Sequence, residues 1–282
     1  MNLSSARKLA SLACAGLAAV LFFPSHSFAQ MGGNNPNMMG ASNSMSDRLY
    51  VGTVDTQADR EQGGAYENFL KQKDPAKKIQ LGSSFLAKYP KGALAERVDV
   101  GMMEVYRGQQ DWKNSYAFAD RALALAPDDV DVLTTIGWTI PHVYSPDDPD
   151  AEQELTKAET YATHALEVLN AMPKPQGMSD AQFEAAKAKR VFQAHSALGL
   201  VYFRREDFDK SASELELATK GNPIQDQTDL FVLGTDLQNL NRFAEAAEAF
   251  GGCSQVPGPL QGQCKDSAAD STRAQANQSK SK

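Results

Sequence analysis

The chain has 282 residues, of which 42% are hydrophobic, and a formal net charge of −7 at pH 7. An acidic chain without a stripe of Lys and Arg is poorly suited to bind nucleic-acid backbones or anionic membrane surfaces. Composition and charge therefore point away from both classes of partner.

Residues 1–29 have the pattern of a signal peptide. A short basic region precedes the apolar run LASLACAGLAAVLFF, and Ser27-Phe28-Ala29 forms a small-x-small cleavage site. Cleavage would leave Gln30 first, with 26 Lys and Arg against 35 Asp and Glu. We expect a periplasmic or secreted protein with no stable membrane insertion after cleavage. The alternatives are an uncleaved anchor and lipidation at Cys14.

Residues 30–56 predict a disordered linker rich in Met, Asn and Gly, because residues 30–47 lack any hydrophobic period. Four methionines in that stretch are soft ligands of the kind that bind Cu(I), but no His or Cys joins them. The following segment, MSDRLYVGTVDTQADREQ, either begins the fold or leads into it.

Residues 191–223 predict a helical hairpin. Apolar residues recur three and four apart from Ala194 to Tyr202, as on one face of a helix. Asp207 is placed to cap a second helix, which ends at Gly221 with Pro223 just beyond. Gly tolerates the left-handed conformation that ends helices, and Pro cannot continue one.

This hairpin resembles one tetratricopeptide repeat (TPR). Leu198-Gly199 match the Leu-Gly pair of the first helix, and Tyr202 matches the aromatic residue of that helix. Phe208 matches the aromatic residue that opens the second helix, and Ser211 takes the small position. The pattern returns in three more stretches, namely 96–127, 130–165 and 228–259. A weaker copy ends at Phe85, Tyr89 and Pro90.

The resemblance implies an all-α fold, a right-handed superhelical solenoid of TPR hairpins (four well defined, one degenerate) with a C-terminal capping helix. Stacked repeats bury one continuous core. We expect the solenoid and its cap at 57–265 and a polar tail at 266–282. The second and third well-defined repeats differ from the pattern: an inserted loop at 141–152 delays one helix, and a capping box at Ser179 begins a helix about twice the usual length.

Cys253 and Cys264 remain after signal cleavage and are an even pair in an oxidising compartment. A disulfide is therefore expected, and it would tie the capping helix to the last repeat. Two separate thiols are the alternative.

No sequence motif indicates catalysis, a metal or a cofactor. The histidines of the mature chain are far apart, and we expect His195 to be a packing residue. The acidic run at 147–152 lacks the register of a calcium loop, so Asp150 is interpreted as a helix N-cap. We expect no catalytic residue, no metal ligand and no cofactor.

The resemblance also implies a concave groove lined by outward positions of each first helix. The groove residues predicted in this way are Arg97, Arg107, Trp138, His142, Phe203, Arg204, Phe231 and Asn239. Exposed aromatic residues and Arg are common at binding hot spots. The alternative is that neighbouring side chains cover the aromatic residues.

These observations predict a non-catalytic periplasmic scaffold or adaptor that binds a protein or peptide partner of the cell envelope. The stretch FLAKYPKG at 85–92 also resembles repeats of outer-membrane assembly lipoproteins and the Tol-Pal coordinator. An accessory factor of an envelope assembly or transport complex is therefore the second hypothesis. An enzyme framed by a solenoid is the third. The sequence does not identify the partner or the oligomeric state.

Overall fold

The structure is a computed structural model that describes residues 48–49 and 58–280. The predicted signal peptide and nearly all of the predicted linker lie outside the described residues. The described part of the chain is entirely helical, with eleven helices and no strand. None of these helices is both long enough and apolar enough to cross a membrane.

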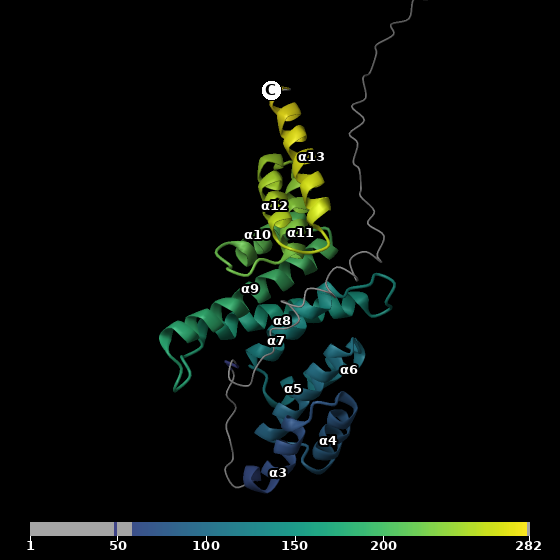
Figure 1. The fold of residues 1–282 in the computed structure, drawn as a ribbon, viewed down its shortest axis with the longest axis vertical. Coiled ribbons are helices and arrows are strands. Elements are labelled where there is room, and N and C mark those ends of the chain that lie inside the picture. The colour runs from purple at the N-terminus through teal and green to yellow at the C-terminus, as the bar shows by residue number, and fades with distance from the viewer. Residues whose placement is uncertain (1–47, 50–57, 281–282) are drawn as a thin grey trace, which may run out of the picture.

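Ten of the helices form five hairpins, and α13 follows them (Figure 1). The hairpins are α3 (Ala58–Lys71) with α4 (Pro75–Lys88), α5 (Ala93–Gly108) with α6 (Trp112–Leu125), α7 (Val130–His142) with α8 (Ala151–Ala171), α9 (Asp180–Arg204) with α10 (Phe208–Thr219), and α11 (Gln227–Asn239) with α12 (Phe243–Gln255), and the last helix is α13 (Gln261–Lys280).

Successive hairpins pack on one another in chain order, which makes a TPR-like solenoid and confirms the predicted fold class. Figure 1 shows the hairpins following one another from α3 at one end of the molecule to α13 at the other. The weakest predicted repeat is present as the hairpin α3–α4, which packs on α5 around the fully buried ring of Phe69.

Small residues let the two helices of a hairpin approach each other. A Cβ added at Gly199 would lie 2.5 Å from Leu215 of α10, and one at Gly234 would lie 2.7 Å from the Phe250 ring of α12. Gly199 belongs to the predicted Leu198-Gly199 pair, and Gly234 follows Leu233 at the same place in the repeat at 228–259. Because glycine has no side chain, each position leaves room for a large residue of the second helix.

Three of the hairpin turns use the same backbone device. Gln110, Glu206 and Asn241 have φ values of 59°, 60° and 57°, which is the left-handed region. In the first two turns the next residue is an N-cap, since the carboxylates of Asp111 and Asp207 each accept a backbone N–H three residues on. The same turn recurs because each first helix must reverse into its second helix.

Helix α9 has the predicted double length, with 25 residues, and begins with the predicted capping box at Ser179 and Gln182. Its first half packs by Phe183 against Leu169 of α8 and Val130 of α7. The extra turns therefore cover the end of the α7–α8 hairpin instead of projecting into solvent.

Two predicted boundaries need correction. Arg48 and Leu49, inside the predicted linker 30–56, are buried against the solenoid. Helix α13 continues to Lys280, so most of the predicted tail 266–282 is helical, with Ser271 buried against Gln238. In addition, Asp150 occupies the N-cap position of α8, but its side chain makes no capping hydrogen bond.

Cys253 and Cys264 form the predicted disulfide, which joins α12 to α13 across a separation of 11 residues. Both cysteines are fully buried in the core of the last hairpin. The bond closes a short loop, so it lowers the conformational entropy of the unfolded chain and stabilises the C-terminal end of the solenoid.

Replacing Cys264 with Ser is expected to lower the free energy of unfolding by about 2–3 kcal/mol, the loop-entropy estimate for a loop this short. The loss should be local. Hydrogen exchange followed by mass spectrometry should show faster exchange in α11–α13 and unchanged exchange in α3–α4. Reduced wild-type protein is the matched control and should behave like the variant, whereas equal loss of protection along the whole chain would contradict the assignment.

Candidate peptide-binding face

The eight residues predicted to line a groove lie on first helices, two on each of α5, α7, α9 and α11. The structure brings those at the ends of α7 and α9 together. The ring centroids of Trp138 and His142 are 3.7 Å apart, and Arg204 Nη2 donates to the carbonyl of Pro141 at 3.2 Å.

Arg204 lies between aromatic rings. Its guanidinium carbon is 5.2 Å from the centroid of Tyr144 and 6.0 Å from that of Phe203, which are cation–π distances. Burial lowers the pKa of Arg204 to about 10, so the side chain stays charged at neutral pH. Phe203 and Arg204 are both half-buried and form the accessible part of this cluster.

The aromatic residues are less exposed than a groove surface would require. Phe231 is only 2% exposed and packs edge-on against Phe250 at 5.5 Å between centroids, so it belongs to the core of the last hairpin. Trp138 is 9% exposed and His142 4%. The expectation of exposed rings is wrong at these three positions, because α7 and α11 are enclosed by the helices on both sides of them.

The remaining predicted residues are separate from that cluster. Arg107 forms an ion pair with Glu104 one turn earlier, with 2.6 Å between Nη2 and Oε2. Asn239 is exposed and donates to the carbonyl of Thr235 at 3.0 Å. Arg97 is half-buried on α5. Their part in binding stays a prediction.

A second site, which sequence analysis did not predict, holds Arg48. The guanidinium of Arg48 forms ion pairs with Glu96 of α5 at 3.0 Å, with the N-cap carboxylate Asp129, and with Asp131 of α7 at 3.7 Å. Arg190 of α9 binds the other oxygen of Asp131, with Nε at 2.6 Å. Two guanidinium groups thus meet three buried carboxylates. The carboxylates belong to the starts of α5 and α7, and Arg190 belongs to α9, so the site joins the first helices of three successive hairpins to Arg48.

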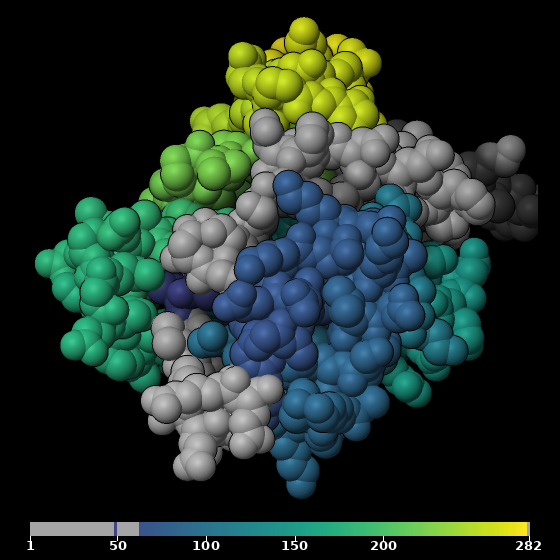
Figure 2. Space-filling model, turned by 60° about the horizontal axis from the view of Figure 1, so that its bottom comes forward, coloured from purple at the N-terminus to yellow at the C-terminus, as the bar shows by residue number. Residues whose placement is uncertain are grey.

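Leu49 is held by both its backbone and its side chain. Its N–H donates to Asp131 Oδ2 at 2.9 Å. Its side chain, 3% exposed, packs in an apolar cluster with Val130, Leu169 and Phe183. Figure 2 shows the two-residue segment in purple, in a recess between the blue N-terminal hairpins and the teal-green helices α8 and α9.

Burial and ion pairing act on these groups in opposite directions. Burial alone would lower the pKa of Arg48, but the carboxylates of Asp129, Glu96 and Asp131 raise it by more, and the net direction is upward. Burial raises the pKa of the Asp129 carboxyl to about 8, and the Arg48 guanidinium opposes only part of this rise. The ion pairs therefore offset part of the cost of burying the carboxylates.

One sequence signal for this site was present. Arg190 lies one turn before Ala194 and so continues the apolar stripe of α9, a position where a charge requires a buried partner. The partner carboxylates are 59 or more residues away from Arg190 in the chain, and nothing local pairs them with it.

Comparisons with known proteins identify the fold and nothing finer. No protein-family model and no curated protein matches the chain. Among solved structures it is similar to the crystal structure of PilW, described as a widely conserved type IV pilus biogenesis factor, with a TM-score of 0.50 and 14% sequence identity. The match covers 77% of this chain and 89% of PilW.

Proposed function

We propose that this protein is a non-catalytic adaptor of the periplasm or cell exterior, which binds a segment of another envelope protein on the face formed by its first helices. The observation that carries the proposal is the way Arg48 and Leu49 are held. Residues 48 and 49 are bound to this face through a charged side chain, a backbone N–H and an apolar side chain. A segment of a partner protein can be held by contacts of the same three kinds.

The similarity to PilW supports a role in an assembly process of the cell envelope. PilW is a pilus biogenesis factor, and its fold is shared over most of both chains. Fold alone does not determine function. The assembly role therefore rests on this analogy together with the predicted export of the chain.

We infer that the partner contacts the half-buried cluster of Phe203 and Arg204 at the end of α9. Arg204 offers charge-assisted hydrogen bonds, and the rings of Phe203 and Tyr144 beside it offer apolar surface. The chemistry suits a segment that carries a carboxylate next to an apolar residue.

The test starts with the mature protein as bait in an envelope extract, followed by calorimetry with the purified partner. Replacing Phe203 with Ala is expected to weaken binding at least about 30-fold, because truncating a hot-spot residue costs about 2 kcal/mol or more. Arg204→Ala is expected to weaken binding and to reduce its dependence on salt.

Leu217→Ala is the matched control, since Leu217 is a large apolar residue, 51% exposed, on the second helix α10. It should bind like the wild type. Full-strength binding by folded Phe203→Ala and Arg204→Ala would show that the partner binds elsewhere.

A further inference from the structure

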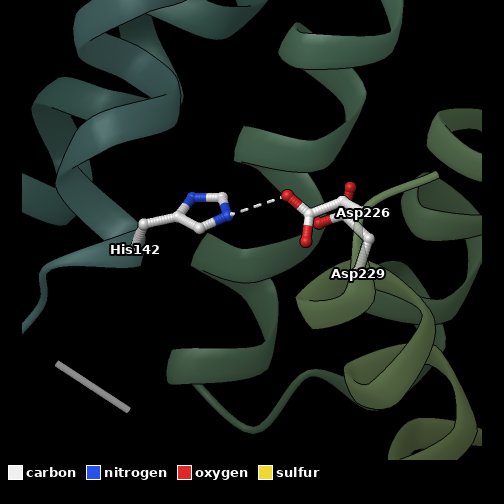
Figure 3. A group of neighbouring side chains, drawn as sticks. All are labelled: His142, Asp226 and Asp229. Carbon is white, nitrogen blue, oxygen red and sulfur yellow. Dashed lines mark ion pairs between the residues drawn. The ribbon is translucent and has the colours of Figure 1, made fainter. Parts of the chain in front are cut away.

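His142, Asp226 and Asp229 form a compact buried group between the end of α7 and the start of α11 (Figure 3). One ligand atom from each residue lies within 4.8 Å of the others, and His142 Nε2 is 3.8 Å from Asp226 Oδ2. The three residues are 4%, 7% and 3% exposed. They are 84 or more positions apart across the pair of helices, which is why their spacing in the sequence indicated no site.

The orientation of the imidazole follows from its other nitrogen. His142 Nδ1 is 2.7 Å from the carbonyl oxygen of Trp138, and a carbonyl oxygen only accepts, so Nδ1 carries the proton. In neutral imidazole, Nε2 then presents a lone pair. The Trp138 ring lies against the imidazole at an interplanar angle of 31° and holds this orientation. A backbone carbonyl on Nδ1 is also what orients many metal-binding histidines.

The lone pair of Nε2 faces acceptors instead of a donor. His142 Nε2 is buried and has no hydrogen-bond partner, and Figure 3 shows the ring edge directed at the Asp226 carboxylate. One oxygen of each carboxylate accepts a hydrogen bond from outside the group. Asp226 Oδ1 accepts the N–H of Thr228, and Asp229 Oδ1 accepts the hydroxyl of Ser196. Each carboxylate therefore keeps an oxygen for the centre of the group.

The charges do not balance within the described chain. Two carboxylates lie together in a buried place, and neither forms an ion pair with a described Lys or Arg side chain. Buried like charges of this kind require a cation or a proton between them. Among the described residues no Lys or Arg side chain forms an ion pair with the group, so either a bound cation or a shared proton has to offset its charge.

We propose that His142, Asp226 and Asp229 bind one divalent transition-metal ion, with zinc as the preferred occupant. One imidazole nitrogen and two carboxylate oxygens are ligands that zinc accepts, while calcium and magnesium prefer oxygen alone. In a tetrahedral zinc site, ligand atoms are about 3.3 Å apart. The observed separations need side-chain shifts of about 1 Å or less to reach that value.

The ion would act as a structural clamp. His142 belongs to α7 and the two aspartates begin α11, while Ser196, which binds Asp229, belongs to α9. Occupancy would join first helices of three successive hairpins on one side of the solenoid. Metal binding would therefore stabilise the C-terminal half against unfolding and fix its curvature.

The test uses the full mature chain after treatment with a chelator. Calorimetry with zinc chloride is expected to show one ion bound per chain, and zinc is expected to raise the melting temperature. Asp229→Asn and His142→Gln should each weaken zinc binding more than about 10-fold, since even outer-shell changes cost that much. Without metal, Asp229→Asn should melt at or above the wild-type temperature, because one of two like charges has gone.

His164→Gln is the matched control. His164 lies next to Asp128 and Glu167 but is exposed, and it is the place where zinc would collect on the surface. This variant should bind zinc like the wild type. No saturable one-to-one binding by wild type would overturn the proposal, as would binding lost in His164→Gln and kept in Asp229→Asn. Should neither ligand variant fold, X-ray absorption of zinc-loaded His164→Gln decides: one imidazole nitrogen on zinc supports the proposal, and none or more than one overturns it.

Discussion

Replacing Asp131 with Ala is expected to lower the free energy of unfolding by about 3–5 kcal/mol, the cost of breaking a buried ion pair by removing one partner. Asp131 is the central acceptor of the Arg48 site. It binds the Leu49 N–H and the Arg190 guanidinium and lies 3.7 Å from Arg48. Its loss leaves Arg190, 3% exposed, without its ion-pair partner on α7.

Asp128→Ala is the matched control, because the Asp128 side chain is 66% exposed and pairs with His164 on the surface. Urea unfolding followed by circular dichroism should show a change of about 1 kcal/mol or less for this variant. Equal stability of Asp131→Ala and Asp128→Ala would show that the buried ion pairs contribute nothing net.

A double-mutant cycle with Arg48→Ala measures how strongly the N-terminal segment is coupled to the solenoid. Arg48 and Asp131 form an ion pair with each other, so their effects should not add. We expect the double variant to be more stable than the sum of the single changes predicts, by about 1–3 kcal/mol. Strict additivity would place Arg48 outside the ion-pair network.

The parts of this fold that follow from local rules were predictable from sequence. The Leu198-Gly199 pair, the Asp207 cap and the capping box at Ser179 each act within one hairpin, and the structure has them where the pattern predicted. The disulfide was predictable too, because the predicted mature chain has two cysteines with a short loop between them.

The sites depend on how hairpins sit on one another, and the repeat pattern does not contain that information. The template placed Phe231 in the groove, but the close stacking of α11 on α12 turned it into the core. The packing of α9 against both α7 and α11 brought His142 to Asp226. Arg48 reached Asp129 across 81 residues from a stretch that shows no periodicity at all.

Replacing Phe250 with Ala is expected to lower the free energy of unfolding by about 3–5 kcal/mol, the usual cost of emptying a buried phenylalanine site. The ring is 1% exposed, packs edge-on against Phe231, and lies over the backbone of Gly234. Urea unfolding of the two proteins measures the loss. A loss of unfolding free energy below about 1 kcal/mol would mean that neighbouring side chains of the last hairpin collapse into the cavity.

The same contact predicts a reversal of sign at Gly234. In the wild type, an alanine Cβ there would lie 2.7–2.8 Å from three ring atoms of Phe250, so Gly234→Ala should destabilise by about 1–3 kcal/mol through overpacking. In the Phe250→Ala background the ring is gone, and the added methyl group should become neutral or stabilising, helped by the better helix propensity of Ala. Gly251→Ala on α12 is the control, because its Cβ would meet nothing within 4 Å and should stabilise both backgrounds equally. If Gly234→Ala destabilised both backgrounds to the same extent, the close approach of ring and glycine would not be what holds α11 to α12.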